Sequence, residues 1–343
     1  MVKNDHILLS VQDLKIHFVG DGKVAHALAG VSYEVSKGET VCIVGESGCG
    51  KTVSALSILG LIPQPPGQIV GGQVLFKGRN LLGLSEDEMQ KIRGNHIAMV
   101  FQEPMTSLNP VFTIGDQVQE AITVHEEVSE TDVRQRCVHL LRDVGIPSPE
   151  ERLADYPHQL SGGQRQRVMI AMALACNPEI VIADEPTTAL DVTIQAQILN
   201  LFGELQRKRD MSLLYITHDL GVVANIADRI YIMYAGIIAE QGNAAEIFHD
   251  SRHPYTQGLL ASLPHRAKRG TRLHSIPGTV PDPAYRPGGC PFHPRCNFAV
   301  ETCGSRFPEM CDYGEGHLSR CPVMYEGSGR ELPFRREPDE HIK

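Results

Sequence analysis

The sequence lacks an apolar stretch of about 20 residues, the length that a helix needs to cross a bilayer. Its first residues, 1–6, also lack the basic start and apolar core of a secretory leader, so we expect no signal peptide. Positive charge is not in excess either, because 41 Asp and Glu outnumber 32 Lys and Arg and give a formal net charge of −9. This balance argues against a broad nucleic-acid-binding surface. Any membrane role is therefore expected to go through a partner.

What is present suits a globular protein with one large domain and a smaller one, since the chain has 343 residues and 42% of them are hydrophobic. The nine cysteines are spread unevenly along the chain. Without a secretion signal, a disulfide framework is the poorer interpretation of the late group. That group is Cys290, Cys296, Cys303, Cys311 and Cys321.

A glycine-rich segment between a predicted strand at 41–44 and a predicted helix at 52–59 has the pattern G-x-x-x-x-G-K-T. Its glycines let successive backbone N–H groups turn toward one point, and the following helix adds the partial positive charge of its N-terminus. Such a loop binds the phosphates of a nucleotide, with the lysine on the β- and γ-phosphates and the threonine on Mg²⁺. The predicted nucleotide-binding residues here are Gly45, Glu46, Ser47, Gly48, Cys49, Gly50, Lys51 and Thr52.

Predicted strands alternate with predicted helices in the second half of the chain, where strands at 179–183 and 212–217 flank a helix at 193–207. This order indicates a mostly parallel sheet that helices cover. In contrast, apolar and polar residues alternate within 7–36, which predicts antiparallel strands. From about residue 86 to 176 the pattern favours helices.

The strand at 179–183 ends in two carboxylates, Asp184 and Glu185. An acid at this edge of the sheet, near a phosphate loop, can hold Mg²⁺, and we assign that role to Asp184. Glu185 lies one residue further along, where it can activate a water near the γ-phosphate, so it is the predicted general base. The alternative is a strand that simply ends in solvated acids.

A second anion site is predicted at Ser161, Gly162, Gly163 and Gln164, which precede a helix at 165–175. Two separate phosphate sites in one chain raise the question of whether both can reach the same nucleotide. If they cannot, two copies must face each other.

Together, the phosphate loop, the Asp-Glu strand and Leu-Ser-Gly-Gly-Gln at 160–164 resemble the ATP-binding cassette (ABC) family. The resemblance implies a head-to-tail dimer in which Ser161, Gly162, Gly163 and Gln164 act on ATP held by the opposite subunit. It also implies an α/β fold with a RecA-like P-loop NTPase core, an N-terminal antiparallel β-subdomain, an inserted helical subdomain at about 95–176 and a small irregular, cysteine-rich C-terminal extension.

Four further residues match the family pattern in order. By resemblance, Gln102 touches Mg²⁺ and the attacking water, and His218 contacts the γ-phosphate. Asp191, in Ala189-Leu190-Asp191, is expected at the dimer interface. Phe18 is the candidate for stacking on adenine, by position only; its alternative is an ordinary strand aromatic.

The resemblance continues past the cassette into the oligopeptide/dipeptide importer subfamily, through segments at 253–260, 276–281 and 289–296. The expected units are a nucleotide-binding domain at 1–250, a C-terminal domain at 251–325 and a poorly ordered polar tail at 326–343. The proline-rich segment after residue 251 shows too little periodicity for a large core of its own.

The cysteine group can supply four thiolates, Cys290, Cys296, Cys303 and Cys321, with Cys311 as a spare. Their spacing leaves zinc, a [4Fe–4S] cluster or plain thiols open. The subfamily resemblance favours the [4Fe–4S] cluster. His293 and His317 are expected to be surface residues rather than ligands.

The resemblance implies an ATP- and Mg²⁺-dependent subunit that powers peptide import from the cytoplasmic face of the cell membrane. Its expected partners are a second, related ATPase subunit, two integral membrane permeases and an extracytoplasmic peptide-binding protein, with no nucleic acid. Alternatives are the same role for nickel or another small solute, a soluble ABC ATPase acting on DNA or ribosomes, and a binding module without ATPase activity. The intact Lys51, Asp184, Glu185 and His218 argue against the last of these.

Overall fold

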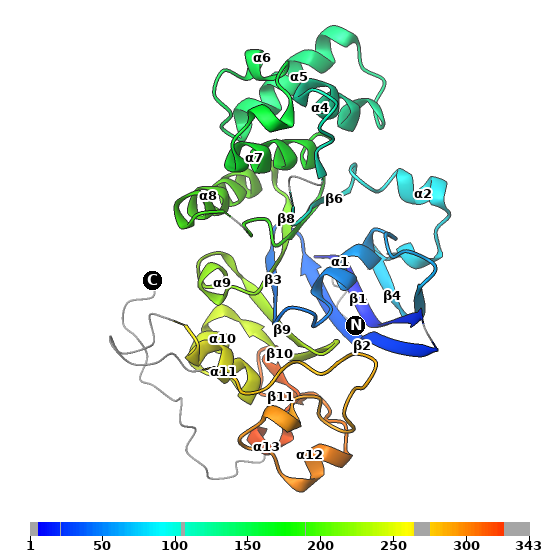
Figure 1. The fold of residues 1–343 in the computed structure, drawn as a ribbon, viewed down its shortest axis with the longest axis vertical. Helices are drawn as coiled ribbons and strands as arrows, with labels where there is room; N and C mark the ends of the chain where they lie inside the picture. The colour runs from blue at the N-terminus through cyan, green and yellow to red at the C-terminus, as the bar shows by residue number, and fades with distance from the viewer. Residues whose placement is uncertain (1–5, 21, 104–106, 189, 264–274, 326–343) are drawn as a thin grey trace.

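The computed structural model describes residues 6–20, 22–103, 107–188, 190–263 and 275–325, and its architecture is shown in Figure 1. Two sheets form its centre. One has four strands in the order β2-β1-β4-β5, and the other has eight in the order β11-β12-β10-β9-β3-β8-β7-β6. This mixed α/β arrangement confirms the predicted fold class.

The four-stranded sheet is antiparallel and is built on the long pair β1 (Ile7–Gly20) and β2 (Lys23–Ser36). Apolar side chains on one face, such as Leu9 and Val31, are fully buried, which is why alternation was visible in the sequence. The sheet is completed by β4 (Gly67–Phe76) and β5 (Arg79–Asn80).

The eight-stranded sheet has a parallel centre, and the predominantly apolar strands β3 (Thr40–Val44) and β8 (Ser212–Thr217) lie side by side in it. Every residue of both strands is buried. One parallel edge strand, β6 (Ile97–Val100), falls where the sequence pattern favoured helix, because four residues are too few to show a period. The remaining strands near the centre are β7 (Ile180–Asp184), β9 (Arg229–Tyr234) and β10 (Ile237–Asn243).

Helices cover the sheets, and a group of them stands apart at the top of Figure 1 as a helical layer. Capping boxes at Thr113 and Ser161 begin two of these helices. The layer contains α4 (Ile114–Thr123), α5 (Glu130–Asp143), α6 (Pro149–Arg152) and α7 (Gly162–Ala173). The other helices of the cassette are α1 (Lys51–Ile58), α2 (Glu86–Gln90), α8 (Val192–Arg209), α9 (Leu220–Ile226) and α10 (Ala244–His249).

The segment after residue 250 packs against the lower end of the large sheet in Figure 1 rather than forming a separate body. Phe292 is 4% exposed and belongs to the main apolar cluster, so this extension shares the core of the cassette. Its strand β12 (Leu318–Ser319) pairs with β10. Its other elements are α11 (Pro254–Ala261), α12 (Glu301–Ser305), β11 (Cys311–Asp312) and α13 (Pro322–Tyr325).

Among the described residues, no helix combines the length and the apolar character that a membrane crossing requires. The tail at 326–343, predicted to be poorly ordered, lies outside the described residues.

Candidate active site

The phosphate loop runs from the end of β3 to the start of α1, as the sequence predicted. Gly50 has φ of 105°, a left-handed conformation, and a Cβ there would lie 2.8 Å from the carbonyl oxygen of Ala27. At Gly45 a Cβ would come 2.2 Å from the carbonyl oxygen of Met233. Both positions therefore require glycine, and the loop can bring its backbone N–H groups close to an anion.

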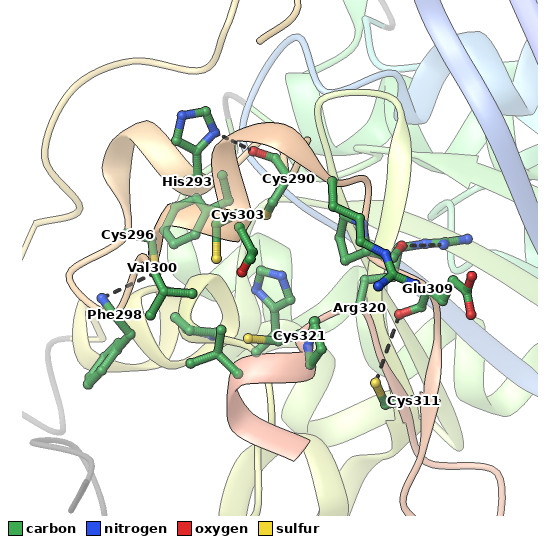
Figure 2. A pocket seen from close by; sticks show the side chains of 18 of the residues that line it. Cys290, His293, Cys296, Phe298, Val300, Cys303, Glu309, Cys311, Arg320 and Cys321 are labelled. Atoms are coloured by element: carbon green, nitrogen blue, oxygen red, sulfur yellow. Dashed lines mark hydrogen bonds between the residues drawn. The ribbon is translucent and has the colours of Figure 1, made fainter. Parts of the chain in front are cut away.

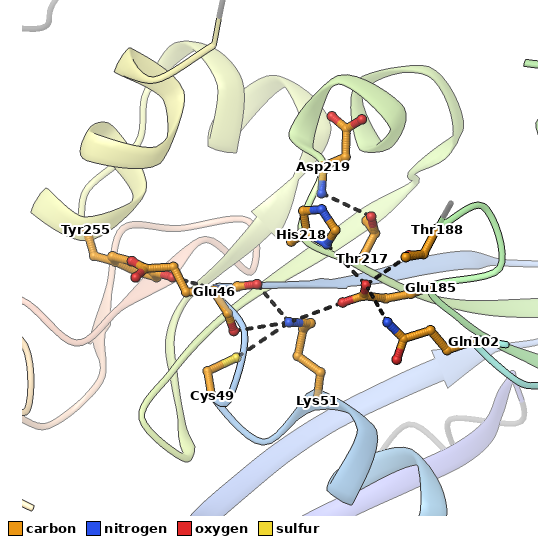
Figure 3. A network of polar contacts seen from close by, with 11 residues as sticks. Glu46, Cys49, Lys51, Gln102, Glu185, Thr188, Thr217, His218, Asp219 and Tyr255 are labelled. Atoms are coloured by element: carbon orange, nitrogen blue, oxygen red, sulfur yellow. Dashed lines mark hydrogen bonds and ion pairs between the residues drawn. The ribbon is translucent and has the colours of Figure 1, made fainter. Parts of the chain in front are cut away.

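Lys51 lies inside this loop and is 5% exposed. Its Nζ donates to the carbonyl oxygens of Gly45 and Glu46, at 2.8 and 3.1 Å, and lies 3.8 Å from Glu185 Oε1. The ammonium thus links the phosphate loop to the end of β7 (Figure 3).

Asp184 ends β7 and is 2% exposed. Burial raises the pKa of its carboxyl, while a hydrogen bond from Thr52 works in the opposite direction. Its Oδ1 is buried and has no hydrogen-bond partner among the described residues. A buried carboxylate oxygen beside a threonine hydroxyl is a donor set that suits Mg²⁺, so the residues present fit the ion.

Glu185 is the centre of a polar network that Figure 3 shows. Its Oε2 accepts hydrogen bonds from Gln102 Nε2 at 3.3 Å and from Thr188 Oγ1 at 3.1 Å, and His218 Nδ1 lies 3.2 Å from the same oxygen. The structure thus brings together Gln102, Glu185 and His218, three residues that lie up to 116 positions apart, which is the difference between 218 and 102. Beyond Gln102, Pro104, Met105 and Thr106 lie outside the described residues.

The Ser161 turn belongs to the helical layer and contacts α8. Ser161 caps α7 and forms a reciprocal capping box with Gln164. A Cβ at Gly162 would lie 3.7 Å from Leu190, and one at Gly163 would lie 2.9 Å from Ile194. Asp191 is exposed and caps α8 by accepting a hydrogen bond from Ile194 N at 2.9 Å.

Phe18 lies in β1, half-buried against the apolar cluster of the smaller sheet. A Cβ at Gly67 would come 3.3 Å from its ring, so β4 covers part of one side. Of the predicted Ala189-Leu190-Asp191 segment, Ala189 lies outside the described residues.

The prediction of a [4Fe–4S] cluster on Cys290, Cys296, Cys303 and Cys321 is wrong. Among the described residues, no group of three or more His, Cys, Asp or Glu side chains is placed to hold a metal ion. The cysteines instead line an open pocket of about 750 Å³, which Figure 2 shows.

The thiols line one pocket, but among the described residues no three of them are placed to hold a metal ion. Cys296 Sγ accepts from Phe298 N at 3.4 Å. Burial raises the pKa of Cys296 to about 11 and that of Cys321 to about 12, so both stay protonated at neutral pH. Spacing along a sequence does not show whether thiols converge on one point.

His317 is also not the surface residue that was expected, because it is 3% exposed. Its Nε2 lies 2.9 Å from Oε1 of Glu240, which is completely buried. Glu240 also accepts from the backbone of His253 at 3.0 Å, so the pair fastens the extension to β10. His293 is half-buried, with Nδ1 2.9 Å from the carbonyl oxygen of Cys290.

Two residues at the site were missed by sequence reasoning. Tyr255 accepts a hydrogen bond from the backbone N–H of Glu46 at 3.0 Å, and Arg295 Nη1 lies 3.1 Å from both carboxylate oxygens of Glu46. They follow Glu46 by 209 and 249 residues, and no local pattern connects them. The geometry as a whole defines a P-loop nucleotide-binding site with a carboxylate network beside it.

Comparison with known proteins agrees with this geometry. Residues 28–188 match the family described as ABC transporter, and residues 239–303 match the oligopeptide/dipeptide transporter C-terminal region. The dipeptide transport ATP-binding protein DppD of Bacillus subtilis is 52% identical over 314 residues, which cover 92% of this chain and 94% of that protein. DppD of Escherichia coli is 50% identical over 323 residues, covering 94% and 98%.

A solved dimeric structure of the ATP-binding cassette MJ0796, in a post-hydrolysis state with ADP and phosphate, superimposes with a TM-score of 0.62 and 29% identity. It covers 69% of this chain and 98% of that one. The chain therefore belongs to the ABC transporter family, and it is an ATPase that uses ATP with Mg²⁺.

Proposed function

We propose that this protein is the ATP-hydrolysing subunit of an ABC importer for dipeptides or oligopeptides. The observation that carries the proposal is the phosphate loop and the Glu185 network in one chain with a C-terminal region of the oligopeptide/dipeptide type. Peptides are favoured over nickel or another small solute because the relatives are named for dipeptide and oligopeptide transport.

In this proposal the subunit works at the cytoplasmic face of the cell membrane. It pairs with a second, related ATPase subunit and docks on two integral membrane permeases, which receive peptide from an extracytoplasmic binding protein. Nucleic acid has no part in it, in keeping with the net charge of −9.

The residue roles follow from the chemistry of the site. The N–H groups of residues 45–52 and the Lys51 ammonium bind the phosphates, and Phe18 contacts adenine. Thr52, Gln102 and Asp184 would hold Mg²⁺, and the bound ion would neutralise phosphate charge. Glu185 accepts a proton from the attacking water, and Gln102 and His218 orient that carboxylate through its Oε2.

The remaining predicted residues act across a dimer. Ser161, Gly162, Gly163 and Gln164 present the N-terminus of α7, and with it a partial positive charge, next to the start of α8. We assign this turn to the ATP of the partner subunit, with exposed Asp191 beside it at the interface.

The test is peptide uptake by cells whose own copy of this gene is replaced by a Glu185→Gln variant. Glutamine keeps the size of the side chain but cannot take a proton, so we expect ATP hydrolysis to fall by about 10² to 10⁴. Uptake of a labelled dipeptide should disappear with it, while binding of a fluorescent ATP analogue by the purified protein stays.

Wild-type protein supplied from a plasmid is the control and should restore uptake. Peptide uptake at the normal rate in the variant would contradict the proposed function. Hydrolysis at the normal rate would contradict the role of Glu185.

A further inference from the structure

Hydrogen bonds join the C-terminal extension to the phosphate loop at Glu46. The backbone N–H of Glu46 donates to the Tyr255 hydroxyl at 3.0 Å, and its carboxylate accepts from Arg295 Nη1, with both oxygens at 3.1 Å. The Arg295 side chain is 6% exposed and the Glu46 side chain 29%. The backbone and the side chain of one loop residue are therefore both held by the extension.

Arg295 is itself fixed from several sides, so it dictates the position of Glu46 and does not follow it. Its Nε donates to the carbonyl oxygen of Pro277 at 2.8 Å, and its Nη1 lies 3.3 Å from the Tyr234 hydroxyl. The guanidinium also lies over the rings of Tyr234 and Phe292, at 5.7 and 5.9 Å from their centres.

Glu46 lies where its charge matters for a nucleotide. Its carbonyl oxygen accepts a hydrogen bond from Lys51 Nζ at 3.1 Å, and the same ammonium also donates to the carbonyl oxygen of Gly45. Because Glu46 belongs to the phosphate loop, an unpaired carboxylate on its side chain would repel a bound triphosphate. Partial burial of the carboxylate would strengthen this repulsion. Arg295 neutralises this carboxylate and draws it to the side of the extension.

We propose that Arg295 and Tyr255 are positioning residues of the ATPase site, which hold Glu46 and thereby set the affinity of the phosphate loop for ATP. The inference rests on the phosphate-binding role proposed for residues 45–52. It assigns to the extension a task in the nucleotide cycle, since neither residue reaches the Glu185 network itself in the described part of the chain.

The test is Arg295→Met, which keeps much of the apolar stem and removes the charge. We expect the KM for ATP and the Kd of a fluorescent ATP analogue to rise about tenfold, because a charge-assisted contact beside the site is lost. The kcat at saturating ATP should change by less than about twofold, because the residues around Glu185 stay in place.

Two rescue variants separate charge from general damage. Arg295→Lys retains the cation and should recover part of the ATP affinity. The double variant Glu46→Gln with Arg295→Met removes the unpaired carboxylate as well, so it should bind ATP more tightly than Arg295→Met alone. A purely structural role predicts that the double variant is no better than the single one.

The matched control is Arg320→Met, in the same extension. Arg320 donates to the carbonyl oxygens of Ile238 and Pro308, at 3.0 and 3.2 Å, and among the described residues it has no hydrogen bond to the phosphate loop. We expect a lower melting temperature with an unchanged KM for ATP. An equal rise of KM in this control, or an unchanged KM in Arg295→Met, would overturn the proposal.

If Arg295→Met does not fold, Tyr255→Phe is the second variant, because it removes only the hydroxyl that accepts from Glu46 N. It should raise the KM for ATP about threefold, and an unchanged KM would equally overturn the proposal.

Lys51→Ala distinguishes failure of the positioning role of Arg295 from failure of the phosphate-binding role proposed for the loop. Loss of ATP binding in Lys51→Ala supports the phosphate loop itself, whatever Arg295 does, whereas normal binding would remove the basis of both.

Discussion

At Glu185 the backbone adopts φ of 45°, a left-handed conformation that a residue with a side chain rarely takes. Its amide donates to the Ile216 carbonyl oxygen at 2.9 Å, which pins this conformation to β8. Such a residue costs roughly 1–3 kcal/mol, and the surrounding contacts offset that cost. The strain turns the carboxylate toward Gln102 and His218 rather than along the strand. The site is thus oriented within the chain itself.

Asp184 gives a pH-dependent prediction at the same scale. Burial raises its pKa above the ordinary 3.8, so the folded protein keeps this proton to higher pH than the unfolded chain does. Ionisation of Asp184 therefore lowers stability as the pH rises from about 4 through the raised pKa, and the loss persists at pH 7. Asp184→Asn should raise the melting temperature of the nucleotide-free protein at pH 7 by about 1–3 °C.

The measurement is thermal unfolding at several pH values between 4 and 8, without and with ATP and Mg²⁺. The gain from Asp184→Asn should shrink toward pH 4, where the wild-type carboxyl is protonated. The variant should also gain less stability from ATP and Mg²⁺ than the wild type. A melting temperature below that of the wild type at pH 7 would contradict the assignment.

Among the elements, α7 combines a structural cap with a proposed function in its N-cap residue, Ser161. Ser161→Ala removes the cap and the hydroxyl and should cost about 1 kcal/mol, whereas Ser161→Gly removes the same hydroxyl for only a few tenths. If the turn acts on ATP of the partner subunit, both variants should lose hydrolysis to a similar degree. Steady-state ATPase rates and chemical unfolding of both proteins separate the two effects.

The prediction would be contradicted if the ATPase rates of the two variants followed their stabilities, so that Ser161→Gly hydrolysed ATP at nearly the wild-type rate. In that case the hydroxyl of Ser161 would matter only for the helix. Both variants should be measured at equal protein concentration, since the proposed site needs two subunits.

The elements also show what the sequence could and could not predict. Strands β3 and β8 were visible because every residue in them is buried, and the loop at 45–52 carries its own pattern. Strand β6 was not, because a four-residue strand carries no measurable period. The contact of Arg295 with Glu46 joins residues 249 apart, which no local spacing encodes. The cysteines show the opposite case, where the subfamily resemblance suggested a cluster-binding set that the described residues do not bring together.

For the molecule as a whole, the extension and the cassette share one core around Phe292. Its ring lies 5.3 Å from that of Tyr234 in β9 and 5.4 Å from that of Tyr255 in α11. Phe292→Ala should cost about 3–5 kcal/mol, as for other buried aromatics, and lower the melting temperature by several degrees. Calorimetry should still show one transition, because the two parts are joined by β12 and by the Glu240–His317 pair.

Phe307 lies in the same extension and is 44% exposed, so it is the matched control for Phe292→Ala. Phe307→Ala should change the melting temperature much less. Two separate transitions in the wild-type protein would contradict a shared core.

The pairing of β10 with β12 also bears on how the protein is made. Glu240 and Gln241 leave the ribosome almost 80 residues before their partners Ser319 and Leu318. During that interval the border of the large sheet has main-chain N–H and C=O groups open to any passing strand, a recognised starting point for aggregation. Translation that stalls or stops before residue 318 would therefore leave this border of the sheet uncovered.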